Sequence, residues 1–222
     1  MSRSRRLDGS SPRSLPRRRV LGLVCAVLMA AALAWVGYQL FLTDLVSQRS
    51  HRRELAGLRS QWQQGQDPAT APVQRGQVVA ALRIPAFGAG YEVPILSGSN
   101  SEVLRRGVGH YSTTAGPGQL GNFALVGYRV THGEPFARLR ELSRGDQVMV
   151  ETRRAIFTYV LDVAPRDLTV RSGDSWVLAP VPGETSAKPT RPLLTLVTSQ
   201  DLLPTDDRSV GFAHLASTQN KG

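Results

Sequence analysis

The chain has 222 residues, enough for one folded domain with appended segments, and it carries a formal net charge of +10 at pH 7. The charge is concentrated at the N-terminus, because residues 1–19 hold seven arginines and one aspartate, whereas residues 43–222 carry only +4. A domain this mildly basic needs no polyanionic partner, so nucleic-acid binding is not expected.

A basic tail and an apolar segment open the chain. Residues 1–19 are rich in Arg, Ser and Pro and predict a disordered cytoplasmic tail. Residues 20–42 hold no charged side chain and as a helix would span roughly 34 Å, enough to cross a bilayer core of about 30 Å. We expect an uncleaved single-pass transmembrane helix, with the N-terminus in the cytoplasm and the C-terminal domain extracellular. A signal peptide cleaved near Ala34 stays open as the alternative.

A polar segment, residues 43–76, follows as a stalk and linker. Its Leu45, Leu55, Leu58 and Trp62 recur at roughly helical spacing, which predicts a helix that prolines in 67–72 interrupt. We expect His51, within this stalk, to be a solvated surface residue.

From Gln77 the pattern becomes that of a mainly β domain, which we place at 77–217 before a short tail at 218–222. Short apolar runs with β-branched and aromatic members alternate with Gly and Pro, and predict a closed β-barrel or a sandwich. The only helices expected are short, at 101–107 and 134–146. The predicted strands are 78–85, 91–96, 122–128, 146–152, 156–163, 176–180, 193–198 and 209–216.

Cysteine is almost absent from the chain. The single cysteine is Cys25, in the middle of the apolar segment. The remaining chain therefore has no disulfide, no thiolate nucleophile and no cysteine metal site.

Several motifs occur together in one order. They are "LRIP" at 82–85, "GVGHYSTTAGPGQLGN" at 107–122, "LVGYRVTHGEPFARL" at 125–139, "LLTLVTSQD" at 193–201 and "DDRSVGFAHL" at 206–215. In this order they resemble a sortase, most closely the class E type of high-GC Gram-positive bacteria. The resemblance implies a closed eight-stranded β-barrel with one or two short helices, preceded by one transmembrane helix. It also implies an extracytoplasmic transpeptidase that cuts a sorting signal through a cysteine thioester, with no cofactor and no metal.

The family's catalytic residues carry over onto three positions of this sequence. The nucleophilic cysteine falls on Ser199, the histidine on Tyr128 and the arginine on Arg208, so that only the arginine is retained. A serine hydroxyl needs a base to become a nucleophile, whereas a phenol, with an ordinary pKa of about 10, is protonated at neutral pH. Losing such cooperating groups costs on the order of 10⁴–10⁶-fold in rate, so we expect an inactive site.

Further residues are candidates for binding or for rescue of catalysis. His110 and Tyr111 belong to the "GHYS" motif, and His132 lies four residues past Tyr128 in a predicted loop. We expect these three and Arg208 to bind peptide in the groove. Either His110 or His132 could alternatively act as a relocated base. The simpler interpretation makes His110 structural, gives His132 a turn-capping role and pairs Arg208 with Asp206 or Asp207.

His214, in the last predicted strand, is expected to face outward or to pack.

The chain is predicted to be a pseudo-sortase that binds a sorting-signal peptide of a cell-surface protein, a pilin or a partner sortase. The alternatives are an active acyl transferase that uses Ser199 with a relocated base, and a purely structural module of the cell envelope.

Overall fold

The computed structural model describes residues 17–68, 73–130, 133–199 and 205–221. The first element, α1, is a helix over Arg17–Gln63. The chain divides into two compact units, residues 1–41 and 42–222, so that the second half of α1 belongs to the same unit as the sheet. Among the described residues, no helix has both the length and the sustained hydropathy needed to cross a membrane.

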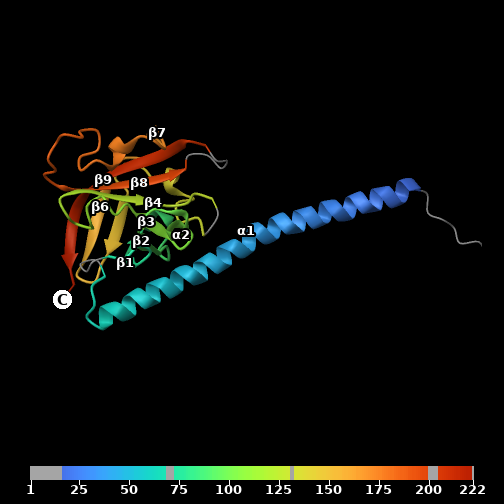
Figure 1. The fold of residues 1–222 in the computed structure, drawn as a ribbon, viewed down its shortest axis with the longest axis horizontal. Coiled ribbons are helices and arrows are strands. Elements are labelled where there is room, and N and C mark those ends of the chain that lie inside the picture. The colour runs from blue at the N-terminus through green and yellow to red at the C-terminus, as the bar shows by residue number, and fades with distance from the viewer. Residues whose placement is uncertain (1–16, 69–72, 131–132, 200–204, 222) are drawn as a thin grey trace, which may run out of the picture. The chain divides into compact units, whose positions relative to one another are not determined.

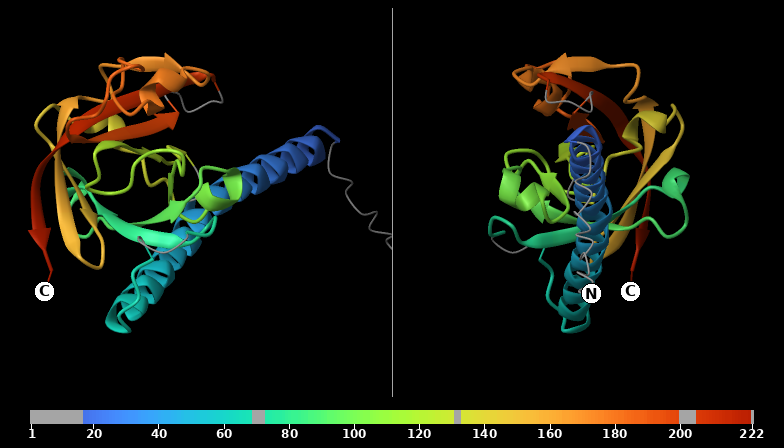
Figure 2. Two further views of the ribbon diagram at one scale, coloured as in Figure 1. Left: turned by 60° about the vertical axis from the view of Figure 1, so that its left-hand side comes forward. Right: turned by 90° about the vertical axis from the view of Figure 1, so that its right-hand side faces the viewer.

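A single curved sheet forms the body of the second unit (Figure 1). Eight strands follow one another in the order β6-β5-β1-β2-β3-β4-β8-β9, and pairing of β6 with β9 closes them into the expected barrel (Figure 2). The short β7 pairs with β9 and completes the sheet. The strands are β1 Val78–Arg83, β2 Val93–Ser97, β3 Val108–His110, β4 Gly121–Val126, β5 Gln147–Glu151, β6 Ala155–Val163, β7 Thr169–Arg171, β8 Pro192–Ser199 and β9 Asp207–Asn220.

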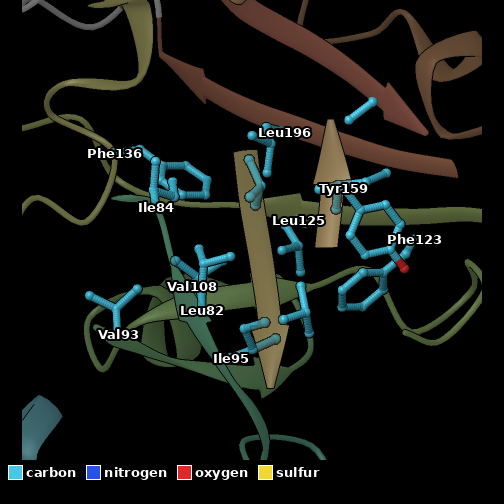
Figure 3. Close-up of a cluster of buried hydrophobic side chains, with 14 of the residues drawn as sticks. Leu82, Ile84, Val93, Ile95, Val108, Phe123, Leu125, Phe136, Tyr159 and Leu196 are labelled. Carbon is cyan, nitrogen blue, oxygen red and sulfur yellow. The ribbon is translucent and has the colours of Figure 1, made fainter. Parts of the chain in front are cut away.

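The core fills the inside of the barrel, where inward-facing side chains from successive strands meet (Figure 3). On β8, Leu194 and Leu196 point into this core, while Val197 belongs to a second apolar cluster with Val170 and Val210. Because side chains alternate along a strand, β8 and β9 carry one row of residues inside the barrel and one row outside. The same alternation decides whether Ser199, the last residue of β8, lies inside or outside the barrel.

The largest error in the predicted elements concerns 176–180, which was expected to be a strand. The segment is instead the 3₁₀ helix η3, Ser175–Leu178. Its main chain is held by the buried Asn122, whose amide donates to the carbonyl of Val177 at 2.9 Å, and by Thr195, whose hydroxyl donates to Asn122 Oδ1 at 2.7 Å. These partners come from β4 and β8, so nothing local to the apolar run indicated the turn.

The helical predictions hold only for short pieces. Residues 101–107 contain α2, Ser101–Leu104, which Asn100 caps by accepting from the Val103 amide. Within 134–146 only the 3₁₀ helix η2, Leu139–Glu141, forms, and a further 3₁₀ helix, η1, covers Pro85–Phe87. The two three-residue strands, β3 and β7, are too short to show a period in sequence and were not predicted.

The stalk helix contacts the barrel, and this contact makes the expectation for His51 wrong. His51 is 5% exposed, and Leu55 and Leu58 on the same helix are buried as well. The polar composition of this segment favoured a solvated position for His51. The apolar side of the helix packs on the barrel instead, and His51 lies on that side. At the other end of the domain, β9 continues to Asn220, beyond the boundary expected at 217.

Candidate functional site

Strand register brings the three carried-over positions to one end of the barrel. In the antiparallel pair β8–β9, Ser199 lies directly opposite Arg208. In the parallel pair β4–β8, Val126 is opposite Val197, and the Gly127 amide donates to the Val197 carbonyl at 3.2 Å just past the strand end. This ladder ends at Val126 and Val197. Tyr128 lies two residues past the end of β4, at the same end of the barrel where Ser199 ends β8.

The face that carries Ser199 follows from alternation. Ser199 is two residues past Val197, and Arg208 is two residues before Val210, and both valines pack in the outer apolar cluster. Ser199 and Arg208 therefore lie on the outer face of the barrel, at the mouth of β8, and both are partly exposed. The hydroxyl at 199 is accessible at a strand end, as a nucleophile position requires.

Two contacts fix the backbone just past the end of β4, where Tyr128 lies. The buried Thr198 donates its hydroxyl to the Gly127 carbonyl at 2.9 Å, which ties the end of β4 to β8. A side chain at 127 would place its Cβ only 2.7 Å from the ring of Phe136, so glycine is required there. The Phe136 amide in turn donates to the Tyr128 carbonyl at 3.0 Å. The position carried over from the family histidine thus has a defined backbone.

Arg208 is held by main-chain carbonyls. Its Nη1 donates to the carbonyl of Thr205 at 2.6 Å and to that of Asp207 at 2.9 Å. The alternative in which Arg208 pairs with the carboxylate of Asp206 or Asp207 is not the contact that the structure describes. A guanidinium braced in this way keeps its full positive charge at the mouth of β8, suited to a carbonyl or carboxylate of a ligand.

Tyr111 is the second predicted binding residue near this charge. Burial raises the pKa of the Tyr111 phenol, and the positive charge of Arg208 opposes that rise. Arg208 is therefore close enough to Tyr111 to act on its charge. The Tyr111 amide donates to the Ala124 carbonyl at 3.0 Å, opposite β4. Tyr111 therefore belongs to the same outer face as Arg208 and Ser199.

His110 points the other way. Its ring packs against the core residue Phe123, with centroids 4.8 Å apart, and its Nε2 donates to the Ala115 carbonyl at 3.0 Å. Burial lowers the pKa of His110, and the hydrogen bonds with Ala115 and Thr114 oppose the shift. On β3 it pairs with Leu125, level with Leu196 on β8, three residues short of Ser199. His110 is therefore a structural residue and not a base for Ser199.

The other histidines do not supply a base in the described part of the chain. His214 lies opposite Leu193, six residues from the Ser199–Arg208 pair along β8, a distance of about 20 Å at a strand rise of about 3.3 Å. Its Nδ1 contacts both carboxylate oxygens of Asp162 at 2.9 Å, an ion-pair role that goes beyond the expected outward or packing one. His51 is buried where the stalk helix meets the barrel, and His132 lies outside the described residues.

The described groups at this end of the barrel are suited to hydrogen bonding. Ser199 has Arg208 opposite it on β9, and Tyr128 follows the end of β4 at the same end of the barrel. Neither a guanidinium nor a phenol hydroxyl is a base of the kind that activates a serine hydroxyl. The described residues contain no cluster of three or more His, Cys, Asp or Glu side chains that could hold a metal ion. The chemistry that these three groups do support is hydrogen bonding to an oxygen-rich ligand.

Sequence and fold comparisons place the chain among known proteins. The sortase domain profile matches residues 82–216. Sortase SrtE1 of Streptomyces coelicolor is 35% identical over 188 residues, which cover 81% of this chain and 52% of that protein. Sortase D of Bacillus subtilis is 34% identical over 48% of this chain and 52% of its own length. The chain thus spans about half the length of these two curated relatives.

Solved structures agree with this assignment. Sortase E of Streptomyces avermitilis matches with a TM-score of 0.60 at 37% identity, over 66% of this chain and 93% of that chain. Sortase E1 of Streptomyces coelicolor, solved with a tripeptide in its active site, matches with a TM-score of 0.58 at 33% identity, over 65% and 91%. The chain belongs to the sortase family, and these relatives are of class E.

Two residues that hold the strands near Ser199 in place were not predicted from the sequence. Thr198 and Asn122 carry buried hydrogen bonds between strands, and each reads locally as an ordinary polar residue in a β run. A polar residue within an otherwise apolar strand is the only signal that could have indicated them, because a buried polar group must find a partner.

Proposed function

We propose that this chain is a sortase-fold protein without transpeptidase activity that binds a sorting-signal-like peptide at the mouth of β8. One observation carries the proposal: the position of the family nucleophile is Ser199, which pairs with Arg208, and the position of the family histidine is Tyr128, just past the end of β4. The only thiol of the chain is Cys25, far away in sequence inside the apolar segment. Without a thiol at position 199 or an imidazole at position 128, the step that forms an acyl-enzyme lacks the groups that start it in the family.

Binding is the part of the family chemistry that the remaining groups support. A guanidinium holds a carbonyl or carboxylate by hydrogen bonds and charge and needs no nucleophile for it. Tyr111 shares the outer face with Arg208 and adds an amphipathic ring of the kind that packs on peptides. That a class E relative was solved with a tripeptide in its active site supports a peptide as the ligand class. The ligand is the sorting-signal peptide of a cell-surface protein, a pilin or a partner sortase.

We further propose that residues 20–42 anchor the protein in the cell membrane, with the barrel on the extracellular side. The support comes from the sequence, because the 23 residues contain no charged side chain and seven arginines precede them. Alkaline extraction of membranes and proteolysis of intact cells test this. Retention in the membrane pellet together with external cleavage of the barrel is expected, and release on extraction would contradict it.

The test of the proposed activity uses the full chain in detergent micelles with fluorogenic LPxTG and LAxTG peptides. We expect no cleavage above that of a Ser199→Ala control, together with saturable peptide binding that Arg208→Ala weakens. Cleavage that disappears in Ser199→Ala, or an acyl adduct on Ser199 detected by mass spectrometry, would establish a serine acyl transferase instead. Neither binding nor cleavage would favour a structural module of the envelope.

A further inference from the structure

The stalk part of α1 docks on the barrel through one face. His51, Leu55, Leu58 and Trp62 are spaced four, three and four residues apart, so they lie along one side of the helix. Leu55 and Leu58 are 4% and 2% exposed, and Leu58 and Trp62 pack in an apolar cluster with Val78, Leu96 and Val103 of the barrel domain. The helix is therefore held by the same kind of contacts as a core element.

Charged residues flank this apolar seam. Arg59 donates to both carboxylate oxygens of Glu92, at 2.6 and 2.7 Å, and Arg106 contacts Glu54 through Nε and Nη2 at 2.8 and 2.7 Å. Near the helix end, the Lys221 ammonium lies 4.6 Å from the centre of the Trp62 ring. These contacts orient the stalk, but exposed pairs contribute little stability by themselves, so the buried seam carries most of it.

His51 is the exception in the seam. It occupies a core position of the docking face, yet its Nε2 is buried and has no hydrogen-bond partner among the residues that the structure describes. It borders a cavity of about 360 Å³, which Tyr91, Glu92, Val93 and Gly133 line from the barrel side. A buried polar atom without a partner costs free energy, and this cost rises sharply when the group becomes charged.

Among the described residues, the carboxylates nearest His51 already have arginine partners. On the barrel side, the Tyr91 hydroxyl donates to the Pro135 carbonyl, and Glu92 is bound by Arg59 and Arg83. On its own helix, Arg52 adds a like charge, whereas Glu54 partly opposes the effect of burial. Burial is the larger influence and lowers the pKa of His51.

We propose that His51 makes docking of the stalk on the barrel sensitive to pH: residues 51–62 pack on the barrel while the imidazole is neutral and are released when it takes up a proton. A histidine in a released, solvated helix has an ordinary pKa near 6.5. Because the docked form disfavours the proton, docking is at full strength above about pH 6.5. It weakens as the pH falls below that value, by up to about tenfold per pH unit. Ser199, Tyr128 and Arg208 take no part in this change.

Hydrogen exchange on the full chain in detergent micelles tests the proposal. Exchange is compared at pH 7.5 and 5.5 after correction for the intrinsic pH dependence of amide exchange. We expect amides in 51–62 to lose up to about tenfold of their protection at pH 5.5, while amides of β8 (192–199) keep theirs. His51→Leu and His51→Gln, which cannot be protonated, are expected to retain stalk protection at both pH values. His214→Asn, which removes a histidine elsewhere on the barrel, is expected to behave as the wild type.

Three results would overturn the proposal. The first is unchanged stalk protection at pH 5.5 in the wild type. The second is a loss in both His51→Leu and His51→Gln as large as that of the wild type. The third is a simultaneous loss in 51–62 and β8, which would mean that acid unfolds the whole domain. Because cleavage and peptide binding are not read in this experiment, its outcome is independent of the proposed function.

Discussion

Ser199 and Arg208 pair directly across β8 and β9, although eight residues of chain lie between them. This pairing keeps the arginine beside the position that the family resemblance assigns to the nucleophile, with Nη1 of its guanidinium held by the carbonyls of Thr205 and Asp207. The serine and the arginine are therefore neighbours at one end of the barrel. The consequences for ligand binding and for restored catalysis are separable by substitution.

Arg208→Ala is expected to weaken peptide binding by about 10–100-fold. A hydrogen bond to a charged group contributes about 1.5–3 kcal/mol, and about 1.4 kcal/mol corresponds to a tenfold change in Kd. Arg208→Lys keeps the charge but loses the fork, so its Kd should lie between those of wild type and Arg208→Ala. Fluorescence anisotropy of a labelled sorting-signal peptide measures the effect. Arg144→Ala, at an exposed arginine before β5, is the charge-matched control, and an Arg208→Ala affinity equal to that of this control would refute the role.

The double substitution Ser199→Cys with Tyr128→His is expected to create hydrolysis of LPxTG or LAxTG peptides. It restores a thiol and an imidazole at two positions that lie at the same end of the barrel, at the end of β8 and just past the end of β4. The activity of either single variant should be lower than that of the double variant by at least about 10²-fold, because the two groups act as a unit. Mass spectrometry should detect a thioester at position 199. A double variant that folds, as judged by circular dichroism, yet neither cleaves nor acylates would mean that the groove differs elsewhere from an active one.

Asn122→Leu is expected to destabilise the domain by about 1–3 kcal/mol, because it removes the partners of Thr195 and of the Val177 carbonyl in a buried setting. The loss should appear as a lower urea midpoint and as faster amide exchange in η3, which this network holds against β4 and β8. Asn220→Leu changes an exposed asparagine on β9 and is the matched control. Equal midpoints for the two variants would show that the network contributes nothing measurable.

Leu58→Ala is expected to lower the stability of the whole barrel by about 2–5 kcal/mol, since Leu58 is 2% exposed and packs on Val78, Leu96 and Val103. Thermal unfolding followed through the barrel's circular dichroism measures this loss. Arg53→Ala, on the exposed side of the same helix, should leave the transition nearly unchanged. A barrel transition that is unchanged in Leu58→Ala would mean that docking of the stalk does not contribute to the stability of the barrel.

Much of the barrel could be predicted because its strands alternate or form continuous apolar runs, as in 156–163 and 193–198. The predictions that failed concerned segments whose structure depends on residues far away in the sequence. The run 176–180 has the composition of a strand, but Asn122 and Thr195 bind its carbonyl and hold it as a turn. The three-residue strands β3 and β7 have no period of their own and exist because their neighbours in the sheet complete their hydrogen bonds.

The sequence by itself determined which reactive groups the protein possesses. That Cys25 is its only thiol, and that serine and tyrosine replace the expected nucleophile and imidazole, are matters of covalent identity that no fold can alter. Only the tertiary structure decided which groups meet. Strand register set Ser199 opposite Arg208, brought the end of β4 before Tyr128 to the same end of the barrel, and placed the His110 ring against the core residue Phe123. Helix docking buried His51, because burial and contact are created by segments that lie far apart along the chain.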